Sequence, residues 1–103
     1  MNTLEGYQME NDPRVLEHEC LCNEIHELYE KKNSDYGDSF IKVRNEFPDA
    51  ILIRLSDKMN RLKKLMIHPE TQQIKDESID DTLMDLANYA LMELVERRLE
   101  RKE

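Results

Sequence analysis

Apolar residues between Pro48 and Pro69 recur at a spacing that only a helix places on one side of the chain. Their intervals are three, four, three and four residues, in the series Leu52, Leu55, Met59, Leu62, Met66. An α-helix returns to the same face at these intervals, and such a stripe is typical of the seam of a helical bundle. Pro48 and Asp49 suit a helix start and Pro69 suits a helix end, so we expect a helix over residues 49–67.

Two more segments show the helical period. A long helix is predicted from about Pro13 to Lys32, with a core face formed by His18, Leu21, Cys22, Ile25, Leu28 and Tyr29. Another is predicted from about residues 76–78 to about Arg101, with a core face formed by Ile79, Leu83, Leu86, Ala87, Ala90 and Leu94. With a short helix near Ser39, three long helices and short links predict an all-α antiparallel bundle.

Length and composition agree with one helical domain. The chain has 103 residues, of which only two are glycine and three are proline. We expect a polar N-terminal arm over residues 1–12 and a single all-helical domain over residues 13–103. The last helix also carries a second apolar stripe, Leu91, Val95, Leu99. A three-helix monomer cannot cover both stripes, so the sequence predicts a homo-oligomer, a dimer or higher.

Charge and cysteine placement limit the class of protein. The net charge of −8 argues against a protein that binds nucleic acid through the phosphate backbone. A small phosphorylated ligand stays possible, because an acidic site can bind it through a divalent cation. Cys20 and Cys22 point apart on a predicted helix, which indicates free thiols and a reducing compartment. We see no secretory signal and no membrane-spanning apolar run, and therefore expect a cytoplasmic protein.

Acidic residues line one side of the last predicted helix. Glu77, Asp81, Asp85 and Asn88 follow one another at intervals of four, four and three residues. Carboxylates four residues apart on a helix can share one divalent cation through their oxygens. Alternatively, Glu77 and Asp81 favour the first turn of the helix electrostatically, and Ser78 with Asp81 is close to a capping box. Asp85 lies mid-helix and is not explained in this way.

The middle helix has a polar side opposite its apolar seam. Asp57 could bind a metal there, and Lys58 and Arg61 could bind phosphate. The alternative is a solvated face with an ion pair between Asp57 and Arg61. A metal role for the first-helix glutamates Glu24 and Glu27 is equally open.

The stretch "KKNSDYGDSF", residues 31–40, is predicted to end the first helix and to form a loop. Lys32 could reach a phosphate from this loop, and Tyr36 could stack on a base. The alternative is that Tyr36 only covers the end of the bundle.

Three runs together resemble a known family. They are "YEKKNSDYGDSF", "LIRLSDKMNRLKKL" and "DESIDDTLMDLANYALM", and they span roughly residues 16–95. They resemble the nucleotide modification associated domain, a family found in phage and bacterial genomes. This resemblance implies a nucleotide-related role and a nucleotide ligand.

A second resemblance is to the all-alpha nucleotide pyrophosphohydrolases of the MazG and dimeric dUTPase type. Those proteins hold Mg²⁺ between a Glu-x-x-Glu pair on one helix and a Glu-x-x-Asp pair on the next. Here Asp57 and Asn60 would take the place of the first pair, and Asp81 and Asp85 that of the second. An asparagine replaces one carboxylate, and the second pair is spaced by four residues instead of three.

These resemblances imply a Mg²⁺-dependent pyrophosphohydrolase acting on a nucleoside triphosphate or a related nucleotide. Asp57, Asp81 and Asp85, with Glu77, would hold the metal. The residues expected to contact the substrate are Lys32, Asp35, Tyr36, Lys58, Arg61 and Asn88. Two alternatives stay open. One is a phage-type module that binds or sequesters a nucleotide or a nucleotide second messenger without cleaving it, and the other is an acidic helical protein that binds other proteins.

Overall fold

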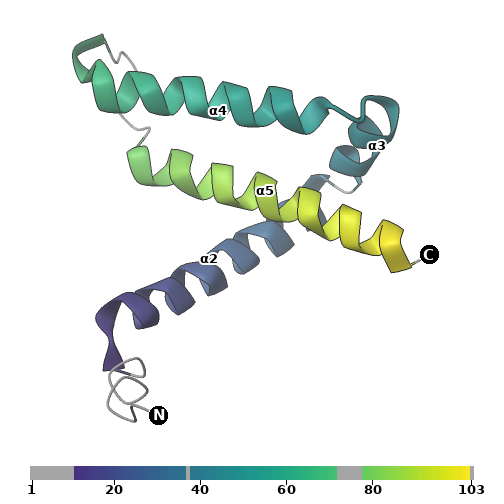
Figure 1. Cartoon of the computed structure of the whole chain (residues 1–103), viewed down its shortest axis with the longest axis horizontal. Coiled ribbons are helices and arrows are strands. Elements are labelled where there is room, and N and C mark those ends of the chain that lie inside the picture. The colour runs from purple at the N-terminus through teal and green to yellow at the C-terminus, as the bar shows by residue number, and fades with distance from the viewer. Residues whose placement is uncertain (1–10, 37, 72–77, 103) are drawn as a thin grey trace. The chain divides into compact units, whose positions relative to one another are not determined.

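The computed structural model describes residues 11–36, 38–71 and 78–102. Its elements, in chain order, are α2 (Pro13–Tyr36), α3 (Ser39–Glu46), α4 (Ala50–Ile67), a 3-10 turn η1 (Pro69–Thr71) and α5 (Ile79–Lys102) (Figure 1). No strand occurs in these residues, so the predicted all-α fold is confirmed. None of the described helices has the length and apolar character needed to cross a membrane.

The chain divides into two compact units, Met1–Asp35 and Tyr36–Glu103, and each is described by itself. The prediction of one domain over residues 13–103, with an arm over 1–12, stays a prediction. In the first unit, α2 begins at Pro13 as expected. The backbone N–H of Arg14 donates to Asp12 Oδ1 at 2.8 Å, so Asp12 caps the helix. Cys20 and Cys22 are free thiols, in agreement with the sequence.

The predicted loop after Lys32 is wrong, because α2 continues to Tyr36. Asn33, Ser34 and Asp35 are poor helix formers but not helix breakers, and a helix that is already formed extends through such residues. The helix ends directly before Gly37 in the sequence, where a glycine commonly follows a helix.

In the second unit, α4 lies alongside α5 and runs in the opposite direction (Figure 1). The predicted seam of α4 is partly wrong. Leu55 and Leu62 are half-buried, but Leu52, Met59 and Met66 are exposed. The buried apolar residues of α4 are Ala50 and Leu65 instead. The helix is thus rotated relative to the predicted seam, and the side that meets α5 includes the polar residues Arg54 and Lys58.

The predicted core face of α5 is right only in part, because of its six residues only Leu86 and Ala87 are half-buried. Ile79, Leu83 and Leu94 are exposed, and the buried residues of α5 are Thr82, Asn88 and Glu93. The apolar side of α5 is therefore left exposed, while a polar side is buried in the second unit. Polar side chains on α3 and α4 decide this orientation, because they find partners on α5.

Candidate functional site

The polar contact between α4 and α5 centres on an ion pair. Lys58 Nζ on α4 lies 3.4 Å from Asp85 Oδ2 on α5, and the two side chains are 18% and 29% exposed. Partial burial of this kind removes much of the water that screens a surface pair. The structure thus brings together two of the residues that the sequence placed in a nucleotide site.

Arg54, one helical turn before Lys58, joins three helices. Its guanidinium lies 5.3 Å from the ring centre of Phe40 on α3 and 5.5 Å from that of Tyr89 on α5. Both are cation–π contacts, and the planar guanidinium suits them better than an ammonium would. Lys58 follows Arg54 by four residues on α4, whereas its partner Asp85 precedes Tyr89 by four residues on α5. The two contacts therefore follow one another along an antiparallel helix pair. These two contacts fix the antiparallel register of α4 and α5.

Buried polar residues continue this layer along α5. Asn88 is buried, three residues after Asp85 and next to Tyr89. Thr82 is buried almost completely, and its Oγ1 donates to the backbone carbonyl of Ser78 at 3.2 Å. Asn88, which was predicted to contact substrate, therefore lies beside the Lys58–Asp85 pair on the buried side of α5.

The predicted metal ligands are not gathered into one group. Asp57 and Asp81 are exposed, and Asp57 lines an open hollow of about 390 Å³ on α4 with Leu52, Ile53, Ser56 and Asn60. Within residues 11–36, 38–71 and 78–102, no three His, Cys, Asp or Glu side chains are placed to hold a metal ion. Glu77 lies outside the described residues. The Mg²⁺ site stays a prediction.

The other predicted contact residues belong to α4 and α2. Arg61 lies on an exposed part of α4. Lys32 is exposed on α2, in the first unit, which is not placed relative to the second. Asp35 and Tyr36 belong to the last turn of α2, and the positions of their side chains lie outside the description.

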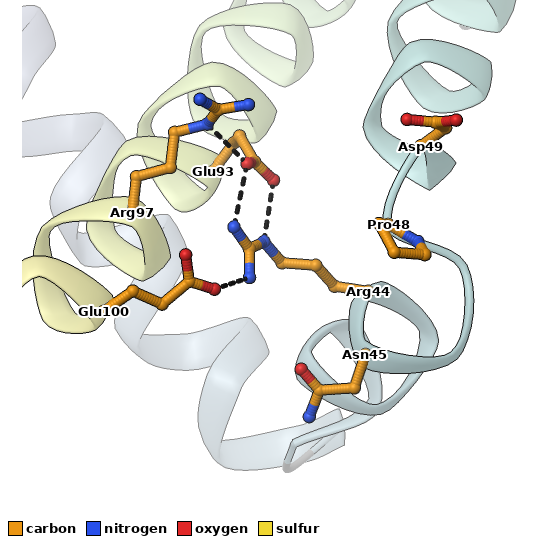
Figure 2. A pocket seen from close by; sticks show the side chains of 7 residues that line it. All are labelled: Arg44, Asn45, Pro48, Asp49, Glu93, Arg97 and Glu100. Carbon is orange, nitrogen blue, oxygen red and sulfur yellow. Dashed lines mark hydrogen bonds and ion pairs between the residues drawn. The ribbon is translucent and has the colours of Figure 1, made fainter. Parts of the chain in front are cut away.

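A second polar cluster, which the sequence did not predict, joins α3 to α5 (Figure 2). Arg44 on α3 donates two hydrogen bonds to the carboxylate of Glu93 in a bidentate ion pair. Its Nε lies 3.0 Å from Oε1, and its Nη2 lies 3.1 Å from Oε2. Nη1 of Arg44 also donates to Glu100, and Arg97 Nε donates to Glu93 Oε2 at 2.8 Å. Two-point contact of this kind fixes both the distance and the orientation of the two helices.

Hydrogen bonds between opposite charges set the electrostatics of this cluster. The side chains of Arg44 and Glu93 are only 15% and 10% exposed. The hydrogen bond from Arg44 holds the pKa of Glu93 below its usual value, against the opposing effect of burial, and Arg97 adds to the lowering. The hydrogen bond from Arg44 also lowers the pKa of Glu100. The pKa of Arg44 is raised, mainly by Glu93 and then by Glu100.

A pocket of about 410 Å³ opens beside this cluster (Figure 2). The remaining lining residues are Asn45, Pro48 and Asp49, from the end of α3 and the link to α4. One local signal for this cluster is visible in the sequence, because Glu93 stands between Met92 and Leu94 with Arg97 four residues later. It could not identify Arg44, which lies 49 residues away from Glu93.

Comparisons with known proteins connect the second unit to a family. No curated protein and no solved structure matches the chain. Residues 32–96 match the family described as nucleotide modification associated domain 1. The match covers more than half of the chain and includes both Lys58–Asp85 and Arg44–Glu93, but not Arg97 or Glu100. The chain therefore belongs to the nucleotide modification associated domain 1 family.

Proposed function

We propose that this protein binds a nucleoside triphosphate, or a related phosphorylated nucleotide, at the contact between α4 and α5. The observation that carries the proposal is the half-buried Lys58–Asp85 pair. Both residues lie within the family match, and the description of the family refers to nucleotides. A partly desolvated ammonium attracts a phosphate oxygen far more strongly than one in bulk water.

The Lys58–Asp85 pair also suggests how a phosphate group would bind. Lys58 and Asp85 neutralise each other at 3.4 Å while no phosphate competes. A bound phosphate would compete with Asp85 for the ammonium of Lys58. Arg54, held between Phe40 and Tyr89, adds positive charge one turn away. Asn88 supplies an amide that can donate to a phosphate or a base.

The finer proposal is Mg²⁺-dependent hydrolysis to a monophosphate and pyrophosphate. Asp81 and Asp85 are four residues apart on α5 and supply the oxygen ligands that Mg²⁺ prefers. When bound, Mg²⁺ would neutralise phosphate charge and acidify a water molecule. The roles of the chain are to hold the phosphates through Lys58 and to orient the nucleotide through Asn88.

Binding without cleavage is the second candidate function. It is favoured by the exposure of Asp57 away from Asp85, and by Asn60 at the position where the pyrophosphohydrolases carry a carboxylate. In this case Lys58 and Asn88 would act in the same way, and the nucleotide would be released intact.

Two variants of the pair separate these functions. We expect Lys58→Gln to weaken nucleotide binding about tenfold, a loss of about 1.4 kcal/mol. In the absence of metal, Asp85→Asn should strengthen nucleotide binding, because it removes the carboxylate that competes with phosphate for Lys58. If the protein is a hydrolase, Asp85→Asn should also lower Mg²⁺-dependent turnover by at least about 100-fold. Lys63→Gln, at an exposed position of the same helix, is the matched control.

The measurement uses a panel of nucleoside triphosphates with and without Mg²⁺, with products resolved by ion-exchange chromatography and binding followed by equilibrium dialysis. A monophosphate that appears only with Mg²⁺ would support the hydrolase. Intact nucleotide retained by the protein would support binding alone. The proposal would be overturned if no nucleotide were bound or changed, or if Lys58→Gln bound as tightly as Lys63→Gln.

A further inference from the structure

Large apolar side chains are exposed along most of the length of α5, in two neighbouring stripes. The six such residues are each between 36% and 50% exposed, namely Ile79, Leu83, Leu91, Leu94, Val95, Leu99. By contrast, only Ala50 and Leu65 are buried among the apolar side chains that the structure describes. A chain of this size depends on apolar burial for stability, so a face of this extent calls for a partner.

The ends of α5 carry opposite charges. Asp80 and Asp81 lie in its first turn, and Arg101 and Lys102 lie in its last turn. If two copies of α5 pack in opposite directions, the acidic turn of one meets the basic turn of the other at both ends. The two helix dipoles are then also antiparallel, which is the favourable arrangement. The face is thus complementary to itself, as a two-fold interface requires.

We propose that this face binds a second copy of the chain, with the two α5 helices antiparallel across a two-fold axis. The midpoint of Ile79–Lys102 falls between Ala90 and Leu91, which places the axis there. In this register Ala87 of each copy faces Leu94 of the other, and Asp80 faces Arg101. Alanines near the axis let the two helices approach closely.

The area is consistent with a dimer. Six side chains exposed to this extent offer on the order of 450 Å² of apolar surface per copy, against about 800 Å² per partner in a standard interface. This area is an upper limit, because Ile79 and Leu99 lie on nearly opposite sides of the helix, and polar residues at the rim add to what is buried. The interface is therefore at the low end of the range for a specific dimer. This inference rests on the exposed apolar residues of α5 and does not require nucleotide binding at Lys58 and Asp85.

The first test is the mass of the full chain in solution by sedimentation equilibrium. We expect a dimer for the wild type, and at least about tenfold weaker association for Leu91→Glu, which sets two carboxylates against each other at the axis. Leu91 is half exposed, so this change should leave the helical circular dichroism unaltered. Leu52→Glu, at a 62% exposed leucine of α4, is the control and should stay dimeric.

A second test addresses direction. Asp80→Lys should weaken the dimer, and adding Arg101→Glu should restore it, because the contact between these two positions is then reversed in sign. The inference would be overturned by a wild type that stays monomeric up to about 1 mM. It would equally be overturned if Leu52→Glu, and not Leu91→Glu, dissociated the dimer, or if adding Arg101→Glu to Asp80→Lys failed to restore association.

Discussion

Arg44 shows at the scale of single residues how a polar side chain orients a helix. Its guanidinium donates to both oxygens of Glu93 and to Glu100, so most of its donors are used within the fold. A guanidinium matches a carboxylate at two points, which an ammonium cannot do. The contact keeps one side of α5 turned toward α3, although that side is less apolar than its opposite.

Removing one partner of this buried pair should be costly. We expect Glu93→Gln to lower the free energy of unfolding by about 2–4 kcal/mol, because Arg44 keeps its charge and loses its fork-like partner. Urea denaturation followed by circular dichroism measures the change. Glu100→Gln is the matched control, since Glu100 contacts the same guanidinium from an exposed position and should cost clearly less. Equal losses in both variants would contradict the central role of Glu93.

The same cluster predicts a pH dependence. The pKa of Glu93 is lowered in the folded protein, so its contribution to stability is present above its ordinary pKa of about 4.3. The contribution is lost as the pH falls through the lowered folded value. Melting temperature measured between pH 7 and pH 3 should thus fall more steeply for the wild type than for Glu93→Gln. Parallel curves would show that Glu93 has an unshifted pKa.

At the scale of elements, the start of α5 is fixed by a local signal. Ser78 Oγ accepts a hydrogen bond from the backbone N–H of Asp81 at 2.9 Å, which is the capping interaction that the sequence suggested. This confirms the helix start near residue 78. The capping bond uses the backbone N–H of Asp81 and leaves its carboxylate uninvolved. A role in the helix start is therefore compatible with a role as a metal ligand.

Loss of this cap should weaken α5. Ser78→Ala is expected to lower the free energy of unfolding by about 1 kcal/mol, because the Asp81 N–H then has no side-chain acceptor. Ser56→Ala, at an exposed position within α4, is the control and should change stability by less than about 0.5 kcal/mol. Chemical denaturation resolves the two. Equal denaturation midpoints for Ser78→Ala and Ser56→Ala would show that the cap does not contribute to stability.

At the scale of the whole molecule, the proposed dimer has a consequence for stability. Association that favours the folded chain raises the melting temperature with protein concentration. We expect the wild type to show this rise over a hundredfold range of concentration, to about 1 mM. The melting temperature of Leu91→Glu should stay constant over the same range. Differential scanning calorimetry measures both, and a constant value for the wild type would contradict the dimer.

The sequence by itself determined the helices and most of their ends. Pro13 after Asp12, and Ser78 before Ile79, act on their own backbone within one turn, so a reader of the sequence can place them. The end of α2 was missed, because Asn33 to Tyr36 disfavour a helix only weakly and no local signal outweighed the formed helix. The family was also accessible, since its three runs stand in order along the chain.

Only the tertiary structure decided which side of each helix faces inward. The apolar stripes of α4 and α5 predicted one pairing, and the contacts of Arg44, Arg54 and Lys58 produced another. Each of these cations has partners on a different helix, far away in the sequence, and a charge-assisted contact is directional where apolar burial is not. The spacing of residues along the sequence therefore identifies an apolar and a polar side of each helix. Which of the two packs against the neighbouring helix depends on partners distant in the sequence, which this spacing cannot identify.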